Sequence, residues 1–224
     1  MKVCNKFNKI CGIILNIIIP LNNTQKNLKN ISPEEFLSLT SQRKVQFPPI
    51  KNSVAIFSYK SKLVKQAIWS LKFKNNSEIS KLFGEILYDY LIEELADLKL
   101  SHNFDKPILI PIPITRKKKL ERGYNQTELI AQEINKLDNN NSFEYRKNIL
   151  KKIKNTLPQS RTSNKKEREE NLKGCFKVIM PKLIKNRNII LLDDVITTGA
   201  TLTEAKKTLQ QYKPRNIICV SLAH

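Results

Sequence analysis

The chain has 224 residues, with 40 Lys and Arg against 20 Asp and Glu, so its formal net charge is +20. Hydrophobic residues make up 40% of the sequence and charged residues 27%, which excludes a wholly disordered chain and supplies enough apolar material for a core. The presence of only 5 Gly and 10 Pro excludes collagen-like and linker-like chains. The length suits one large domain, or one domain with an appendage.

The positive excess attracts polyanions, which include nucleic acid, phosphorylated small molecules and anionic membrane surfaces. A composition biased toward Asn and Lys, with lysines spread over solvated faces, accounts for the charge equally well. The charge alone therefore does not identify a partner.

The cysteines are scattered and form no Cys-x-x-Cys pair; they are Cys4, Cys11, Cys175 and Cys219. This spacing fits neither a disulfide framework nor a zinc ribbon. We therefore expect a cytoplasmic protein in a reducing compartment, without structural zinc.

Residues 10–21, with the sequence ICGIILNIIIPL, form the most apolar stretch of the chain. The stretch is shorter than the roughly 20 residues that span a bilayer, so no transmembrane segment is expected. Lysines precede it as in a signal peptide, but no small-x-small cleavage site follows. We expect a buried or amphipathic helix that ends at Pro20, with a signal peptide or a membrane-surface anchor as the alternative. Residues 1–52 would form an N-terminal helical appendage, with a helix starting at Ser32-Pro33.

Apolar periodicity predicts alternating strands and helices over the rest of the chain. Strands are predicted at 54–57, 108–112, 144–150, 175–179, 189–192 and 217–222. Helices are predicted from Leu63 and from Ile79, and over 125–137 and 200–212. Trp69, Phe73 and Tyr88 are expected in the core, and residues 151–174 as an exposed basic loop followed by a short helix. This alternation predicts an α/β fold with a parallel sheet.

Residues 189–201 carry the clearest chemical pattern. Four apolar residues predict a buried strand whose carboxyl end delivers Asp193 and Asp194 to the edge where open α/β sheets bind ligands. A loop of threonines and Gly199 then enters a helix, and its hydroxyls and backbone N–H groups complement a phosphate monoester. Carboxylates accept hydrogen bonds from vicinal hydroxyls, so the pattern favours a sugar phosphate. The structural alternative is a strand, a tight turn and a capped helix, with the acids serving the turn.

This segment resembles the 5-phosphoribosyl-1-pyrophosphate (PRPP) motif of type I phosphoribosyltransferases. More narrowly, the chain resembles the ComF/GntX family of competence-associated phosphoribosyltransferase-like proteins. The further matching segments are Pro111-Ile112-Pro113-Ile114, Glu121-Arg122-Gly123-Tyr124-Asn125-Gln126, the spaced Arg168, Asn171, Gly174 and Phe176, and Tyr59 to Phe73. The resemblance implies a phosphoribosyltransferase-like domain over 53–224, with a mostly parallel central sheet flanked by helices and a small hood. The paired cysteines of the family's N-terminal zinc ribbon are absent after Pro20.

The resemblance implies roles for individual residues. The ribose hydroxyls would be bound by Asp193 and Asp194. The 5′-phosphate would be bound by Thr197, Thr198, Gly199, Ala200 and Thr201. The loop after the first core strand would bind pyrophosphate through Arg116, Arg122 and Gly123. The hood loop would contribute Arg161, Arg168 and Asn171. No catalytic side chain and no metal site made by the protein alone are implied, since Mg²⁺ would arrive bound to the substrate.

The implied activity is that of a glycosyltransferase, which moves a phosphoribosyl group to an unknown nitrogen nucleophile and releases pyrophosphate, in association with DNA uptake. One alternative is an accessory factor that binds single-stranded DNA, for which Tyr124 and Tyr145 are the nearby stacking candidates. Another is a regulator that senses PRPP without turnover. Neither His102 nor His224 stands in a catalytic pattern.

Overall fold

The computed structural model of the protein describes residues 28, 31–40, 45–46, 50, 52–74, 76–156 and 165–224. The helix expected over 10–21, together with Cys4 and Cys11, lies outside the described residues. Within those residues, no helix combines the length and the apolar character needed to cross a bilayer.

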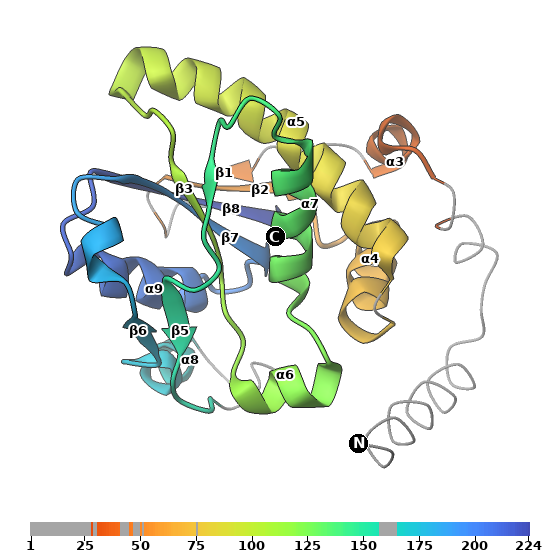
Figure 1. The fold of residues 1–224 in the computed structure, drawn as a ribbon. Coiled ribbons are helices and arrows are strands. Elements are labelled where there is room, and N and C mark those ends of the chain that lie inside the picture. The colour runs from red at the N-terminus through yellow and green to blue at the C-terminus, as the bar shows by residue number, and fades with distance from the viewer. Residues whose placement is uncertain are drawn as a thin grey trace.

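A six-stranded sheet in the order β1-β2-β8-β7-β3-β4 forms the centre of the molecule (Figure 1). Its strands are β1 (Val45–Gln46), β2 (Ser53–Phe57), β3 (Ile108–Pro111), β4 (Glu144–Tyr145), β7 (Asn188–Val195) and β8 (Asn216–Ala223). Neighbouring strands are parallel except for β1 and β2. The predicted α/β fold with a mostly parallel sheet is therefore confirmed.

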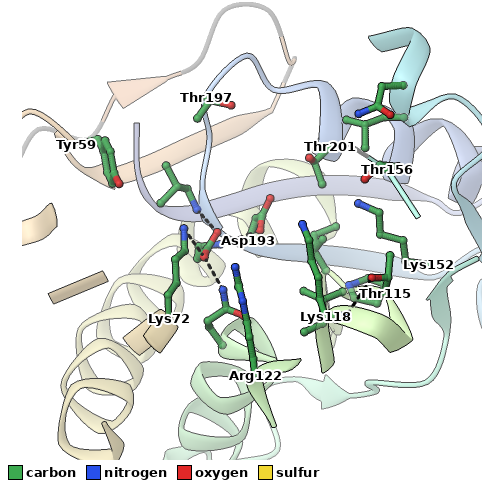
Figure 2. A pocket seen from close by; sticks show the side chains of 18 residues that line it. Tyr59, Lys72, Thr115, Lys118, Arg122, Lys152, Thr156, Asp193, Thr197 and Thr201 are labelled. Carbon is green, nitrogen blue, oxygen red and sulfur yellow. Dashed lines mark hydrogen bonds and ion pairs between the residues drawn. The ribbon is translucent and has the colours of Figure 1, made fainter. Parts of the chain in front are cut away.

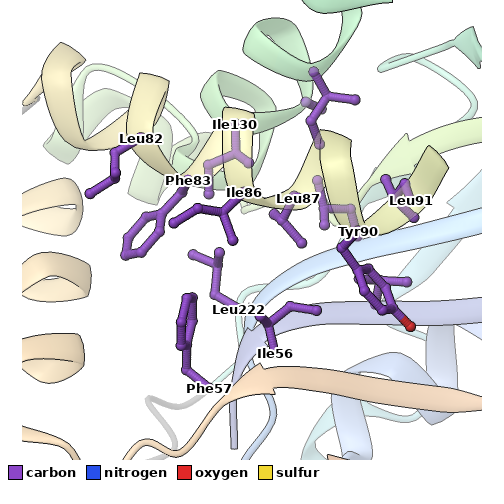
Figure 3. Close-up of a cluster of buried hydrophobic side chains, with 14 of the residues drawn as sticks. Ile56, Phe57, Leu82, Phe83, Ile86, Leu87, Tyr90, Leu91, Ile130 and Leu222 are labelled. Carbon is purple, nitrogen blue, oxygen red and sulfur yellow. The ribbon is translucent and has the colours of Figure 1, made fainter. Parts of the chain in front are cut away.

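Helices cover both faces of this sheet. The helices of the described residues are α3 (Pro33–Thr40), α4 (Lys62–Phe73), α5 (Ser77–His102), α6 (Arg116–Arg122), α7 (Gln126–Leu137), α8 (Lys165–Leu172) and α9 (Ala200–Gln210), with a 3-10 turn at Pro181–Leu183. Successive strand residues point to opposite faces, so Ile190 and Leu192 join the core beneath α5 and α7, while Ile189 and Leu191 join a second core with α9. Figure 3 shows the first of these cores.

The single strand predicted over 144–150 is instead two short strands of different sheets. Strand β4 extends the central sheet, whereas β5 (Leu150–Lys152) pairs antiparallel with β6 (Phe176–Val178) in a separate two-stranded sheet. In the chain, α8 lies between the two strands of this small sheet. Together they form the region where the resemblance places the hood.

The prediction of a loop after the first core strand is also wrong, because residues 116–122 form helix α6. Thr115 begins the helix, and its hydroxyl accepts a hydrogen bond from the Lys118 backbone N–H at 3.3 Å. Gly123 ends it in the left-handed conformation, with φ at 86°. The helix contains no buried residue, so apolar periodicity could not have revealed it.

Part of the predicted appendage packs into the main core. The Phe36 ring of α3 lies 5.4 Å from that of Phe57 and 5.7 Å from that of Phe83, both edge-on. Aromatic pairs at this spacing add to the stabilisation from burial. The boundary predicted at residue 52 therefore does not separate two cores.

One of the predicted core aromatics is not buried. Tyr88 packs against the core with its ring 6.2 Å from Phe143, and Trp69 is half-buried. Phe73, however, is 55% exposed. The buried face of α4 contains Val64, Ala67, Ile68 and Leu71, and the prediction for Phe73 is wrong because it lies beyond that face.

Helices α5 and α7 approach closely at Gly84, where an added Cβ would overlap Cβ of Glu133. We expect Gly84→Ala to lower the free energy of unfolding by about 1–3 kcal/mol, despite the better helix propensity of alanine, because the helices must separate. Urea unfolding measures this change, with exposed Asp89→Ala on the same helix as the control. A Gly84→Ala protein as stable as the wild type would contradict the close packing.

Candidate functional site

A cavity of about 370 Å³ opens at the carboxyl ends of β3 and β7 (Figure 2). Its polar lining residues are Tyr59, Lys72, Thr115, Lys118, Arg122, Gln126, Lys152, Thr156, Asn171, Asp193, Asp194, Thr197 and Thr201. The lining thus joins two carboxylates to four cationic side chains. An excess of positive charge around an acid pair favours a ligand that carries several negative charges.

Asp193 is the buried member of the acid pair, with 9% of its surface exposed. Its Oδ1 accepts a hydrogen bond from the Asp194 backbone N–H at 2.9 Å. Burial, and then the negative charge of Asp194, raise the pKa of Asp193 to about 7, against weaker opposing effects of that N–H group, Lys72 and Lys152. Asp193 is therefore partly protonated near neutral pH.

Asp194 is held by side chains from two other elements. Its Oδ2 lies 3.0 Å from Lys72 Nζ and accepts a hydrogen bond from Gln126 Nε2 at 3.3 Å, while Oδ1 accepts one from the Val195 backbone N–H at 2.7 Å. Burial opposes the charged form of Lys72, but the charge and hydrogen bond of Asp194 outweigh it and raise the pKa of Lys72. One acid of the pair is therefore in an internal ion pair, whereas Asp193 makes none among the described residues.

Lys118 and Lys152 bring positive charge that no carboxylate in the described part of the chain balances by an ion pair. Burial lowers the pKa of Lys118, and the nearby charges of Lys152 and Arg122 lower it further. Burial likewise lowers the pKa of Lys152, against weaker effects of Cys175 and Asp193. Bringing cations together costs free energy, which a bound polyanion would offset.

The loop between β7 and α9 presents hydrogen-bonding groups at the start of a helix. Thr197 and Thr201 line the cavity. Gly199, with φ at 76°, precedes α9 in a conformation that glycine adopts at little cost, and no side chain caps that helix. The Thr198 hydroxyl is buried without a hydrogen-bond partner among the described residues. Such a helix start suits an anion.

The structure brings many of the residues predicted from the sequence to one cavity. Those that line it are Asp193, Asp194, Thr197, Thr201, Arg122 and Asn171. Thr198, Gly199 and Ala200 belong to the adjoining loop and helix start but are not lining residues.

The remaining predicted residues lie elsewhere or outside the description. Arg116 is exposed on the first turn of α6 and does not line the cavity. Gly123 does not line it either, and its positive φ is explained by the end of α6. Arg161 lies outside the described residues, and for Arg168 only its place in α8 is described.

Sequence reasoning missed Lys72, Gln126 and Lys152 as site residues, whereas Lys118 was expected only as one of the lysines that flank Arg116 and Arg122. Lys72 and Gln126 stand inside segments that carry the family resemblance, Tyr59 to Phe73 and Glu121 to Gln126. No local pattern in the sequence, however, indicates that either side chain would reach Asp194.

Known proteins with similar sequences indicate the kind of domain to which this cavity belongs. Residues 126–224 match the model of the phosphoribosyl transferase domain. Competence protein F from Haemophilus influenzae is 35% identical over 147 residues, which cover 64% of this chain and 60% of that protein. Competence protein ComFC from Bacillus subtilis is 26% identical over 160 residues, covering 71% and 58%. DNA utilization protein YhgH from Escherichia coli is 26% identical over 162 residues, covering 72% and 67%.

The chain thus spans less than two thirds of the length of the two competence proteins. Among solved structures, a hypoxanthine phosphoribosyltransferase from Staphylococcus aureus covers 62% of each chain at 14% identity, with a TM-score of 0.34, a likeness too distant to support an assignment. The matched phosphoribosyl transferase domain includes the acid pair and the threonine loop at the end of β7, and the curated relatives are consistent with such a domain. The domain match and these relatives support a phosphoribosyltransferase-like protein of the ComF type, to whose competence-associated members the chain is similar.

Proposed function

We propose that the cavity binds PRPP together with Mg²⁺ and that the protein transfers its phosphoribosyl group to a nitrogen nucleophile. The observation that carries this proposal is the meeting of the acid pair, the threonine loop and four cationic side chains in one cavity. The acids accept hydrogen bonds from the ribose, Thr197 and Thr201 bind the 5′-phosphate, and Lys118, Arg122 and Lys152 face the diphosphate. Mg²⁺ held by the substrate's own oxygens would neutralise part of the diphosphate charge, beside Lys118, Arg122 and Lys152.

In this reaction the bond between C1 of the ribose and the diphosphate oxygen breaks, and its electron pair leaves with pyrophosphate. The lone pair of the nucleophile forms the new bond to C1, and the proton that the nitrogen loses passes to the departing diphosphate. No side chain forms a covalent bond. The residues of this chain act by orientation and by stabilising negative charge on the leaving group.

Arg122 and Arg116 offer a matched pair of variants, because Arg122 lines the cavity and Arg116 does not. We expect Arg122→Gln to weaken PRPP binding roughly 10- to 100-fold and to change ribose 5-phosphate binding little, because only PRPP carries a diphosphate. Arg116→Gln should leave both affinities unchanged. Isothermal titration calorimetry with Mg²⁺ measures both ligands.

A wild-type protein that does not bind PRPP with Mg²⁺ would overturn the proposed function. A screen for pyrophosphate release across purines, pyrimidines and small amines then identifies the nucleophile. Binding without release for every acceptor would instead indicate a regulator that senses PRPP.

A second function, binding of single-stranded DNA, is favoured by two neighbouring aromatic rings on α4, the half-buried Trp69 and the exposed Phe73. The Trp69 and Phe73 rings lie 5.5 Å apart on α4. Lys74 Nζ lies 5.4 Å from the Trp69 ring, and the Arg122 guanidinium lies 5.5 Å from the Phe73 ring. Bases stack on such rings while neighbouring cations bind phosphates.

The aromatic residues suggested by the sequence, Tyr124 and Tyr145, suit this role less well, because both are half-buried whereas Phe73, the neighbour of Trp69, is 55% exposed. The Tyr124 hydroxyl donates a hydrogen bond to the Leu71 carbonyl at 2.9 Å. Burial, and then the charge of Glu128, raise the pKa of Tyr145 to about 12, consistent with its enclosed position. The stacking surface is therefore assigned to Trp69 and Phe73.

We expect the Trp69→Ala/Phe73→Ala protein to bind a labelled single-stranded oligonucleotide about 10-fold more weakly or worse, since each stacked base contributes about 1–3 kcal/mol. Fluorescence anisotropy at low and at physiological salt measures the loss. Leu100→Ala, an exposed apolar residue at the far end of α5, is the control. Absence of wild-type affinity at low salt would remove this second function.

A further inference from the structure

Gln126 lines the cavity and has a buried acceptor without a partner among the described residues. The residue begins α7, is 3% exposed and lines the cavity. Its Nε2 donates to Asp194 Oδ2 at 3.3 Å. Its Oε1 is buried and accepts no hydrogen bond from any described residue. A buried carbonyl in this state costs free energy until a donor reaches it.

The orientation of this amide follows from its surroundings. Turning it over would place Oε1 against Asp194 Oδ2, an acceptor, and the two oxygens would repel each other. The backbone is held as well, because Asn125 caps α7 by accepting from the Thr127 N–H at 3.3 Å and donates through Nδ2 to the Ile112 carbonyl at 3.0 Å. Oε1 therefore has a fixed position beside the acid pair.

The hydrogen-bonding capacity of the acid pair is already partly used. Asp194 Oδ2 is in an ion pair with Lys72 and accepts a hydrogen bond from Gln126 Nε2. Asp194 Oδ1 accepts a hydrogen bond from the Val195 backbone N–H. A ribose diol brings two hydroxyl donors to this place. An acceptor other than Asp194 that is fixed, uncharged and unpaired is well suited to one of them.

We propose that Gln126 Oε1 accepts a hydrogen bond from a ring hydroxyl of the bound pentose, which makes Gln126 a residue that selects ribose over deoxyribose. This inference rests on the proposed binding of a phosphorylated pentose at the acid pair. A site with a buried acceptor discriminates strongly against a ligand that lacks the matching donor, because the acceptor is then left unpaired. The selectivity therefore belongs to the amide oxygen and not only to the carboxylates.

The test compares ribose 5-phosphate with 2-deoxyribose 5-phosphate and 3-deoxyribose 5-phosphate by calorimetry. The wild type should bind one of the deoxy sugars roughly 10-fold or more weakly than ribose 5-phosphate. Gln126→Met, of similar size, should reduce that ratio several-fold, the remainder being the share of the carboxylates, and Gln126→Leu repeats the test if the first variant is unstable. Gln132→Met, a half-buried position on the same helix outside the cavity lining, should keep the wild-type ratio.

The ratio of affinities separates selection from a general loss of structure, which would weaken all the sugars alike. Undiminished discrimination in the Gln126 variants would overturn this inference and leave the proposed function standing. The same conclusion would follow if the wild type bound all these sugars equally. Failure of the wild type to bind any of them, or PRPP, would overturn the proposed function itself.

Discussion

The Asp193→Asn protein is expected to be more stable than the wild type at pH 8 and yet to bind PRPP more than 100-fold more weakly. The pKa of Asp193 is raised from 3.8 to about 7 in the folded protein, mainly by burial and by the charge of Asp194. Between these two values the folded state holds a proton that the unfolded state has released. The stability of the wild type therefore falls as the pH rises from about 4 to about 7. Asparagine does not ionise, so the variant escapes this loss.

Urea unfolding of both proteins at pH 5 and pH 8 measures the difference. The advantage of Asp193→Asn should be larger at pH 8, while PRPP titration shows the loss of binding. Asp105→Asn, at an acid that is 66% exposed, should show no comparable change with pH. A stability difference for Asp193→Asn that is the same at both pH values would contradict the raised pKa.

The Lys72→Met protein should lose both stability and PRPP affinity. Lys72 is the ion-pair partner of Asp194, and the side chains are 24% and 14% exposed. Removing one member of such a pair leaves a largely buried carboxylate unbalanced next to a second acid. We expect a loss of about 1–3 kcal/mol at pH 8, less than for a fully buried pair because solvent screens part of the charge. The raised pKa of Lys72 means that it is charged in both states at this pH.

The loss should be smaller at pH 5, because the charge of Lys72 lowers the pKa of Asp193 and without it Asp193 takes up a proton more readily. Adding Asp194→Asn to Lys72→Met should recover much of the stability, because the unbalanced charge is then gone. Lys62→Met, at an exposed lysine of the same helix, is the control. If Lys72→Met matched the control in both stability and binding, the ion pair would have no role.

The elements with strong local patterns were predictable from the sequence. The run from Ile189 to Asp194 predicts a buried strand that ends in two acids. In the structure, strand β7 covers Asn188–Val195. Helix α7 was expected over 125–137 and covers Gln126–Leu137. Helix α6 was not predictable in this way, because its stability comes from its caps and its chain composition rather than from an apolar face.

The same helix explains why the basic residues were only partly assigned. In a helix, residues four apart share a face, so Lys118 and Arg122 both reach the cavity while Arg116 is exposed. In a loop, the spacing of two residues does not indicate whether their side chains share a face. Lys72, Gln126 and Lys152 come from α4, α7 and β5, and only the tertiary fold brings them to the end of β7.

Arg122 takes part in two proposed binding sites, because it lines the cavity and its guanidinium also lies over the exposed ring of Phe73. A diphosphate that draws the guanidinium inward would uncover that ring, and a base seated on the ring would compete for the same guanidinium. Occupancy of the two places would then be energetically coupled, and thermodynamic reciprocity requires each ligand to change the affinity of the other by the same factor.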